Sequence, residues 1–397
     1  MAADRPPIPG PVKGLAVVSF LNDLASEMVY PLLPAFVTRT LGGGPLALGA
    51  LDGAADLAAS GLRWWSGRWA DRPGWRAPLI LGGYLTAIVL RPVIGLASQA
   101  WQVVGIRVLD RVGKGLRSPA RDAVIADVTP AGVHGRAFGL HRSADHLGAV
   151  LGSLLAFELL RRGTPVRDVL AWSLWPGLLA FMALVVALRM ARGAGEAAAD
   201  GPDGLAPTPA APMPTALAGL AVLAAVRLPE TLLLLRLQDR GLPIAMVPLV
   251  WGLLHIVKSI ASYPAGVIAD RFGVVAALGL GTLAYAATVL GMGRDLEPGV
   301  AMAVFLAYGV AGGLLEPAER AAVARVAGSK RGRAFGTYQA LAGGGALATG
   351  LGYGWIYQTF GGGPALMIGS LAAATALFGW LVLARPTAPT GGGPGRP

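Results

Sequence analysis

The sequence predicts an all-α integral membrane protein whose twelve transmembrane helices form two six-helix bundles related by a pseudo-two-fold axis. Three observations predict this fold. Of the 397 residues, 54% are hydrophobic and only 14% are charged, which is too apolar for an ordinary soluble protein. Apolar stretches close to the about 20 residues that cross a bilayer recur along the chain. Several motifs of the first half are also repeated in the second half.

The apolar stretches fall into two sets of six. We expect the first set over roughly 14–38, 46–70, 77–97, 100–126, 136–160 and 168–190. The second set is expected over roughly 215–237, 244–269, 274–293, 299–325, 334–359 and 364–384. The stretch between the sets has no hydrophobic periodicity, which is typical of a flexible linker. The expected domains are a bundle at 1–190, a cytoplasmic linker at 191–214, a second bundle at 215–385 and a disordered tail at 386–397.

The basic residues indicate an orientation in the membrane. The net charge is +11, but lysines and arginines are scattered singly among apolar stretches, so no nucleic-acid partner is expected. They are more frequent in the loops that would be cytoplasmic if the N-terminus is inside. We therefore expect a multi-pass protein of the plasma (inner) membrane with both termini cytoplasmic. The first apolar run lacks a signal-peptide cleavage site and is interpreted as a retained helix.

The two halves repeat each other. "GRAFG" occurs at 135–139 and again at 332–336, and "ADR" occurs at 70–72 and 269–271. "SPARDA" at 118–123 corresponds to "EPAERA" at 316–321, at nearly the same offset. In transporters built from parallel repeats, the substrate site lies near the bilayer midplane between the halves, which rock to give alternating access.

Here the sequence resembles the major facilitator superfamily, in its drug and metabolite exporter-like branch. "SGRWADRPGWR" is similar to the family's loop between the second and third helices and matches it at Gly67, Asp71, Arg72 and Gly74. "RVLDRVGKG" is similar to the fourth-helix motif and matches at Arg107, Gly113 and Gly115. "GAVLGS" is similar to the antiporter motif of the fifth helix, but Ser153 stands where proline is usual. The resemblance implies that the loop residues form a cytoplasmic gate.

The fourth predicted helix carries a stripe of charge. At 100° per residue its charged side chains lie within an arc of about 140°, and they are Arg107, Asp110, Arg111, Lys114, Arg117, Arg121 and Asp122. Charge at mid-membrane costs at least about 2.5–3.5 kcal/mol, so this stripe must face protein or a watery cavity. The corresponding positions of the second half have lost most of their charge. This asymmetry favours a function particular to the first half.

The first helix offers carboxylates to this stripe. Asp23, Glu27 and Tyr30 share one helical face, and the resemblance implies that helices one and four both line the cavity. We therefore expect Asp23 and Glu27 to meet Arg107, Arg111 or Lys114 there. A carboxylate that alternates between paired and protonated states provides a physical basis for proton coupling. A static ion-pair network between the two helices remains the alternative.

Other charged residues are assigned by position. Asp56 on helix two and Lys258 on helix eight are further candidates for the cavity. The cytoplasmic gate is expected to include, beside the loop motif, Arg121, Asp122, Arg136 and Asp145. His141, Asp145 and His146 are close in sequence and could suggest a metal site. A third ligand that converges with them is not evident, so no metal site is predicted.

The sequence predicts a transporter and not an enzyme. "VGKGLRS" lacks the glycine and the Ser or Thr of a phosphate-binding loop, and no cofactor is expected. We interpret the chain as a monomeric, proton-coupled secondary transporter that exports a small anionic or zwitterionic molecule, since cations outnumber carboxylates in the stripe. Its expected partners are this solute, protons and the lipid bilayer. Alternatives are an uptake symporter or uniporter of the same fold, and a non-transporting membrane sensor or scaffold.

Overall fold

The computed structural model describes residues 6–33, 36–42, 45–199, 213–242 and 246–383, and these residues are almost entirely helical. For some of them, residues 45–57 included, only the backbone is described. The predicted tail at 386–397 and most of the predicted linker lie outside the described residues. The structure is helical at both ends of that linker, because one helix continues to Ala199 and the next begins at Met213.

The first half consists of helices in an up-and-down order. Their bounds are α1 Gly10–Val29, η1 Tyr30–Leu32, η2 Phe36–Thr40, α3 Pro45–Ala70, α4 Arg76–Val93, η3 Ile94–Leu96, α5 Ala100–Asp127, η4 Ala131–Val133, α6 His134–Arg161, α7 Val166–Trp172 and α8 Leu174–Ala199. α7 and α8 together occupy the sixth predicted span.

The second half repeats this order. Its helices are α9 Met213–Ala225, α10 Glu230–Asp239, α11 Val247–Phe272, α12 Val274–Met292, α13 Pro298–Val326, α14 Arg331–Phe360 and α15 Gly362–Leu383. α9 and α10 divide the seventh predicted span, and Pro229 is the N-cap residue of α10. A proline placed there cannot continue the preceding helix, but it suits the start of a new one.

Seven segments of the described residues are long and apolar enough by themselves to cross a membrane. α5 is not among them, although it has 28 residues, because its charged stripe lowers its hydropathy. Large apolar side chains remain exposed on the outside of the bundles, for example Leu154 and Phe157 on α6 and Phe378 on α15. Such contiguous apolar surface is what a lipid-facing helix presents.

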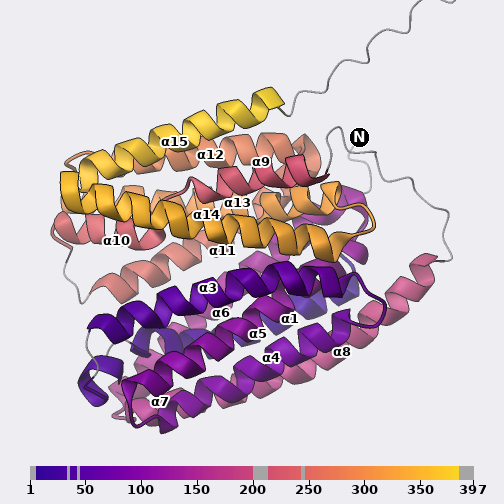
Figure 1. The fold of residues 1–397 in the computed structure, drawn as a ribbon, viewed down its shortest axis with the longest axis horizontal. Coiled ribbons are helices and arrows are strands. Elements are labelled where there is room, and N and C mark those ends of the chain that lie inside the picture. Colours follow the sequence, from indigo (N-terminus) through magenta and orange to yellow (C-terminus); the bar gives the residue numbers. More distant parts are fainter. Residues whose placement is uncertain (1–5, 34–35, 43–44, 200–212, 243–245, 384–397) are drawn as a thin grey trace, which may run out of the picture.

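The two halves lie side by side and meet along two pairs of helices. Figure 1 shows the first half in indigo to magenta and the second half in pink to yellow, with α3 beside α14. α6 and α11 form the other extensive contact between the halves. Small residues make both contacts close. A Cβ atom on Gly67 would lie 2.4 Å from the carbonyl oxygen of Gly332, and one on Gly266 would lie 2.1 Å from that of Gly135.

Candidate functional site

A cavity of about 420 Å³ lies between the two halves. Helices α1, α3, α5 and α6 contribute to its wall from the first half, and α9, α13 and α14 contribute from the second. Its basic side chains are Arg63, Lys114, Arg117, Arg121, Arg142, Arg227 and Arg320. Its acidic side chains are Asp23, Asp145, Glu316 and Glu319. The described wall therefore carries more positive than negative charge.

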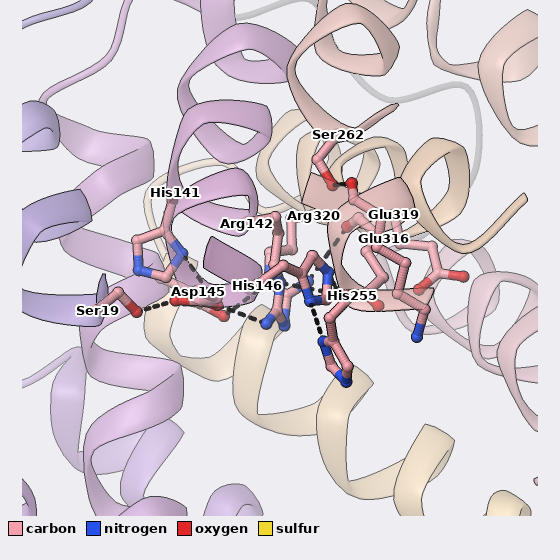
Figure 2. Close-up of polar contacts among 12 residues, drawn as sticks. Ser19, His141, Arg142, Asp145, His146, His255, Ser262, Glu316, Glu319 and Arg320 are labelled. Atoms are coloured by element: carbon pink, nitrogen blue, oxygen red, sulfur yellow. Dashed lines mark hydrogen bonds and ion pairs between the residues drawn. The ribbon is translucent and has the colours of Figure 1, made fainter. Parts of the chain in front are cut away.

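The four carboxylates are not equally engaged. Arg142 binds Asp145 at 2.7 Å on its own helix and Glu316 at 3.2 Å on α13, so it joins the halves (Figure 2). Arg227 binds Glu319 at 2.6 Å. Asp23 accepts a 2.9 Å hydrogen bond from the Asn22 amide, and the described ion pairs do not include it. Among the carboxylates of the described wall, Asp23 is thus the one without a described ion pair.

Lys114 is the most exposed of the three cations that α5 contributes to the cavity wall. Its neighbours Gly113, Gly115 and Arg117 are buried, whereas Lys114 is exposed to solvent in the interior of the bundle. The structure gives Lys114 no ion pair among the described side chains, although Asp23 is an electrostatic neighbour. Of the predicted cavity residues, Asp23 and Lys114 therefore line this space together.

The other predicted residues of α1 and α5 form a second polar cluster beside the cavity. The guanidinium of Arg107 stacks 3.5 Å above the Tyr30 ring, and that of Arg111 lies 5.0 Å from the same ring. Arg107 pairs with Asp110 at 3.0 Å on its own helix. Arg91 of α4 also binds Asp110, at 3.4 Å. Here α1 and α5 approach each other through Tyr30 and Arg107, and the described carboxylate partner of Arg107 is Asp110 and not Asp23 or Glu27.

Glu27 is half-buried one turn beyond Asp23 on α1 and accepts a 3.4 Å hydrogen bond from Ser26. Asp56 belongs to α3, but its side chain lies outside the described residues. Lys258 is buried on α11, away from the lining of the cavity, and forms an ion pair with Glu230. The Tyr308 hydroxyl donates to the same carboxylate at 3.1 Å.

The predicted gate residue Asp71 caps a helix of the other half. Its carboxylate accepts hydrogen bonds from the backbone N–H groups of Gly332 at 2.7 Å and Arg333 at 2.8 Å, at the first turn of α14. A carboxylate at this position satisfies orphan donors and opposes the positive end of the helix dipole. Asp71 therefore ties α3 to α14.

The repeat reproduces this contact. Asp270 at the end of α11 accepts bonds from the N–H groups of Gly135 at 2.8 Å and Arg136 at 2.9 Å, at the first turn of α6. The Arg136 side chain lies 3.6 Å from the same carboxylate. Both contacts lie at the end of the molecule that carries the predicted cytoplasmic loops, and they hold the halves together there.

The remaining predicted gate residues lie at different depths. Arg72 is exposed and lies 5.0 Å from the Trp69 ring, while Gly74 adopts a φ of 78° in the turn before α4. Arg121 lines the cavity and binds the buried Asp122 at 2.9 Å. Asp122 in turn binds residues of the second half, Arg320 at 3.4 Å and Gln339 at 2.8 Å. Asp145 also lines the cavity and accepts a hydrogen bond from Ser19.

Sequence reasoning missed several polar residues of the second half that complete the site. Glu316, Glu319 and Arg320 lie in "EPAERA", so the repeat with "SPARDA" was the signal for finding them. Gln339 of α14 also lines the cavity. The described residues contain no group of three or more potential metal ligands.

Comparison with known protein families identifies the family of this chain. Residues 15–257 and 215–397 match the profile of the Major Facilitator Superfamily. The uncharacterized protein Rv2265 of Mycobacterium tuberculosis is 30% identical over 364 residues, which cover 86% of this chain and 85% of that protein. The uncharacterized MFS-type transporter MJ1317 of Methanocaldococcus jannaschii is 37% identical over 142 residues, 36% of this chain and 35% of that protein. The multidrug resistance protein MdtH of Edwardsiella ictaluri is 30% identical over 146 residues, 37% of this chain and 36% of that protein.

Two solved structures share the fold over nearly the whole chain. The human organic anion transporter MFSD10 superimposes with a TM-score of 0.71 at 18% identity, covering 95% of this chain and 100% of that one. The proton:xylose symporter XylE superimposes with a TM-score of 0.71 at 15% identity, covering 95% and 96% of the two chains. At such low identity these similarities establish the architecture alone.

Proposed function

Since this chain belongs to the Major Facilitator Superfamily, a family of secondary transporters, we propose that it exports a small organic anion or zwitterion in exchange for protons. The substrate occupies the central cavity between the halves. In this proposal the bundles at 1–190 and 215–385 rock about the cavity, and the end where α3 meets α14 is cytoplasmic. The protein acts as a monomer in the plasma membrane, with both termini in the cytoplasm.

The observation that carries the proposal is the charge of the cavity wall. Most of its arginines are already paired, but Lys114 is exposed to the cavity without an ion pair among the described side chains. An ammonium group in a confined, partly desolvated space favours an anionic solute. Asp23 and the other wall carboxylates favour a solute that also carries a positive group. The name of the structurally similar human protein, an organic anion transporter, supports the first feature.

Export and proton coupling have separate support. The similarity to MdtH, a multidrug resistance protein, favours export for this chain as well. The name of XylE records proton coupling in a protein of the same fold. Asp23 lines the cavity beside Lys114, and among the described ion pairs none joins it to an arginine, unlike the other wall carboxylates. A carboxylate in that position can exchange a proton when an anion approaches Lys114.

Proton release from purified protein in detergent tests the proposal. A pH indicator is followed while anionic, zwitterionic and cationic solutes are added in turn. We expect release on adding one anionic or zwitterionic solute, and loss of that release in Asp23→Asn. Asp168→Asn is the matched control, because Asp168 is an exposed aspartate of α7 outside the cavity.

Two outcomes would contradict the proposal. If a solute binds by calorimetry and no proton is released, the transport is not proton-coupled. If only cations bind, the assignment of the substrate class is wrong, and the positive wall has a structural role instead.

A further inference from the structure

The contact between α6 and α11 contains a pair of histidines that face each other from opposite halves. His146 of α6 and His255 of α11 bring their Nδ1 atoms to 3.1 Å (Figure 2). Their ring centroids are 5.1 Å apart, and the Trp251 ring packs against His255 at 5.0 Å. His146 is buried and His255 is half-buried. Neither residue belongs to the gate or to the lining of the central cavity.

The distance between the two Nδ1 atoms restricts how many protons the pair can hold. At 3.1 Å one nitrogen must donate and the other must accept, so at least one ring has a free lone pair on Nδ1. One added proton is compatible with this contact, because a charged N–H donor forms a stronger hydrogen bond than a neutral one. A second added proton would place two donors opposite each other. The contact therefore suits one exchangeable proton.

The surroundings provide a counter-charge for that proton. The Glu316 carboxylate lies 3.8 Å from Nε2 of His146, and Arg142 binds the same carboxylate oxygen at 3.2 Å. Lys258 of α11 and Glu230 of α10 also face the pair and neutralise each other in an ion pair. On α6 itself, Asp145 directly precedes His146 and Arg142 lies one turn before it. The charged neighbours of these two residues are Asp23 of α1 and Arg121 and Asp122 of α5.

We propose that His146 and His255 together form a proton-binding site at the contact between the two halves. In the closed conformation His146 is buried and His255 is half-buried, and burial opposes the added charge, so this conformation binds the proton less tightly than a separated one in which water reaches both rings. By linkage, a falling pH favours the separated conformation. The charged His146 also competes with Arg142 for Glu316, which links the bound proton to a basic residue of the cavity. The use of this proton in transport rests on the proposed function.

A neighbouring contact gives a control that does not titrate. Ser143 donates to the carbonyl of Ser259 at 2.6 Å, and Ser259 donates back to the carbonyl of Ser143 at 2.9 Å. These bonds join the same two helices near the histidine pair. Ser259→Ala should weaken the contact at every pH, whereas loss of a histidine should remove the pH dependence itself.

Distances between spin labels on the two halves test the proposal without any substrate. The chain contains no cysteine, so labels at Gly193→Cys and Ser329→Cys, both exposed, are unique. Lowering the pH from about 8 to about 6, across the range in which histidine titrates, should decrease the closed population. We expect His146→Gln and His255→Gln to abolish this response. Ser259→Ala and His134→Gln should keep it, because the His134 ring bonds to Ala126 within its own half.

A measurement on the unmodified protein decides the matter if the variants do not fold. The chain has only 4 histidines, so ¹⁵N-histidine spectra in nanodiscs are simple. A hydrogen bond between two Nδ1 atoms should produce a scalar coupling between two ring nitrogens. Absence of that coupling across the pH range, or a pH response retained in either glutamine variant, would overturn the proposal. Because no solute is present, either result is independent of whether an anion is transported.

Discussion

The predicted gate, where α3 meets α14 and α6 meets α11, differs from the central cavity in how closely its two halves match. At the gate, Asp71 caps α14 and Asp270 caps α6 with two backbone hydrogen bonds each, so the two halves contribute equivalent contacts. In the cavity the equivalence is lost. Lys114 corresponds to Gly312, and a Cβ atom there would lie 3.0 Å from the side chain of Lys258, which arrives from α11. The capping contacts at this end of the molecule are duplicated, whereas residues that face the cavity have diverged.

This difference has a physical reason. To close one end, each half must bind the other. A carboxylate of one half and a helix N-terminus of the other form this contact, once in each direction. A small solute has no two-fold symmetry. If the two halves carried the same charged groups, some of those groups would have no counterpart on the solute. Asymmetric charge in the cavity is what recognition of such a solute requires.

Removal of one partner from a buried pair of the cavity should give the largest effect. Arg227→Met leaves Glu319 buried without its 2.6 Å partner, which should destabilise the protein by about 3–5 kcal/mol. The double variant with Glu319→Gln should recover most of this loss, because no unpaired charge remains. Unfolding in mixed detergent micelles measures both free energies. An equal loss in the single and double variants would show that the arginine contributes by packing and not by neutralising the carboxylate.

Neutralisation of Lys114 should affect binding and not folding. Lys114→Gln removes one charged hydrogen bond to an anionic solute, worth about 1.5–3 kcal/mol, so affinity should fall about 10- to 100-fold. Calorimetric titration of the detergent-solubilised protein gives the dissociation constant. Arg192→Gln, at an exposed position near the end of α8, is the matched control and should leave affinity unchanged. Unchanged affinity in Lys114→Gln would remove the central argument for an anionic substrate.

Larger side chains at the close glycine contacts of the gate should destabilise the closed conformation equally in both halves. Gly67→Val and Gly266→Val each force a side chain against backbone atoms, at a cost of about 1–3 kcal/mol. Distances between spin labels should show loss of the closed conformation in both variants. Gly252→Val is the control, since its Cβ would meet nothing within 4 Å. A large effect in only one half would break the equivalence of the gate.

The two capping carboxylates should give the smallest effects. Asp71→Asn and Asp270→Asn retain a side-chain acceptor but lose the charge, so each should weaken closure by about 0.3–1 kcal/mol. Raised salt should reduce both effects, because the dipole interaction is screened. The closed population at low and high salt measures this. If the two variants weaken closure by different amounts, the two capping contacts contribute unequally in energy although their hydrogen bonds are equivalent.

Much of the fold was predictable because a bilayer demands long apolar helices. The family resemblance and the helical fold are confirmed, and the spans agree with the helices to within several residues. The division of the sixth and seventh spans into two helices each was not predicted. Pro229 gave a local signal for one division, but hydropathy alone does not distinguish a broken helix from a continuous one.

The site was predictable only in part. Helical periodicity placed Asp23 on one face of α1 and Lys114 on one face of α5, and both line the cavity. It did not identify Asp110 as the partner of Arg107, because the choice among carboxylates depends on distances of a few ångströms in three dimensions. The predicted roles of these residues in transport stay predictions.

The sequence alone therefore determined the class of the protein, its repeat and the helices that carry charge. These follow from local properties, since apolar length, periodicity and repeated motifs are readable along one chain. Only the tertiary structure decided which charges pair, that Glu316 meets Arg142, and that His146 meets His255. The last two contacts join residues more than 100 positions apart. Their geometry arises from the packing of whole helices, which no local pattern records.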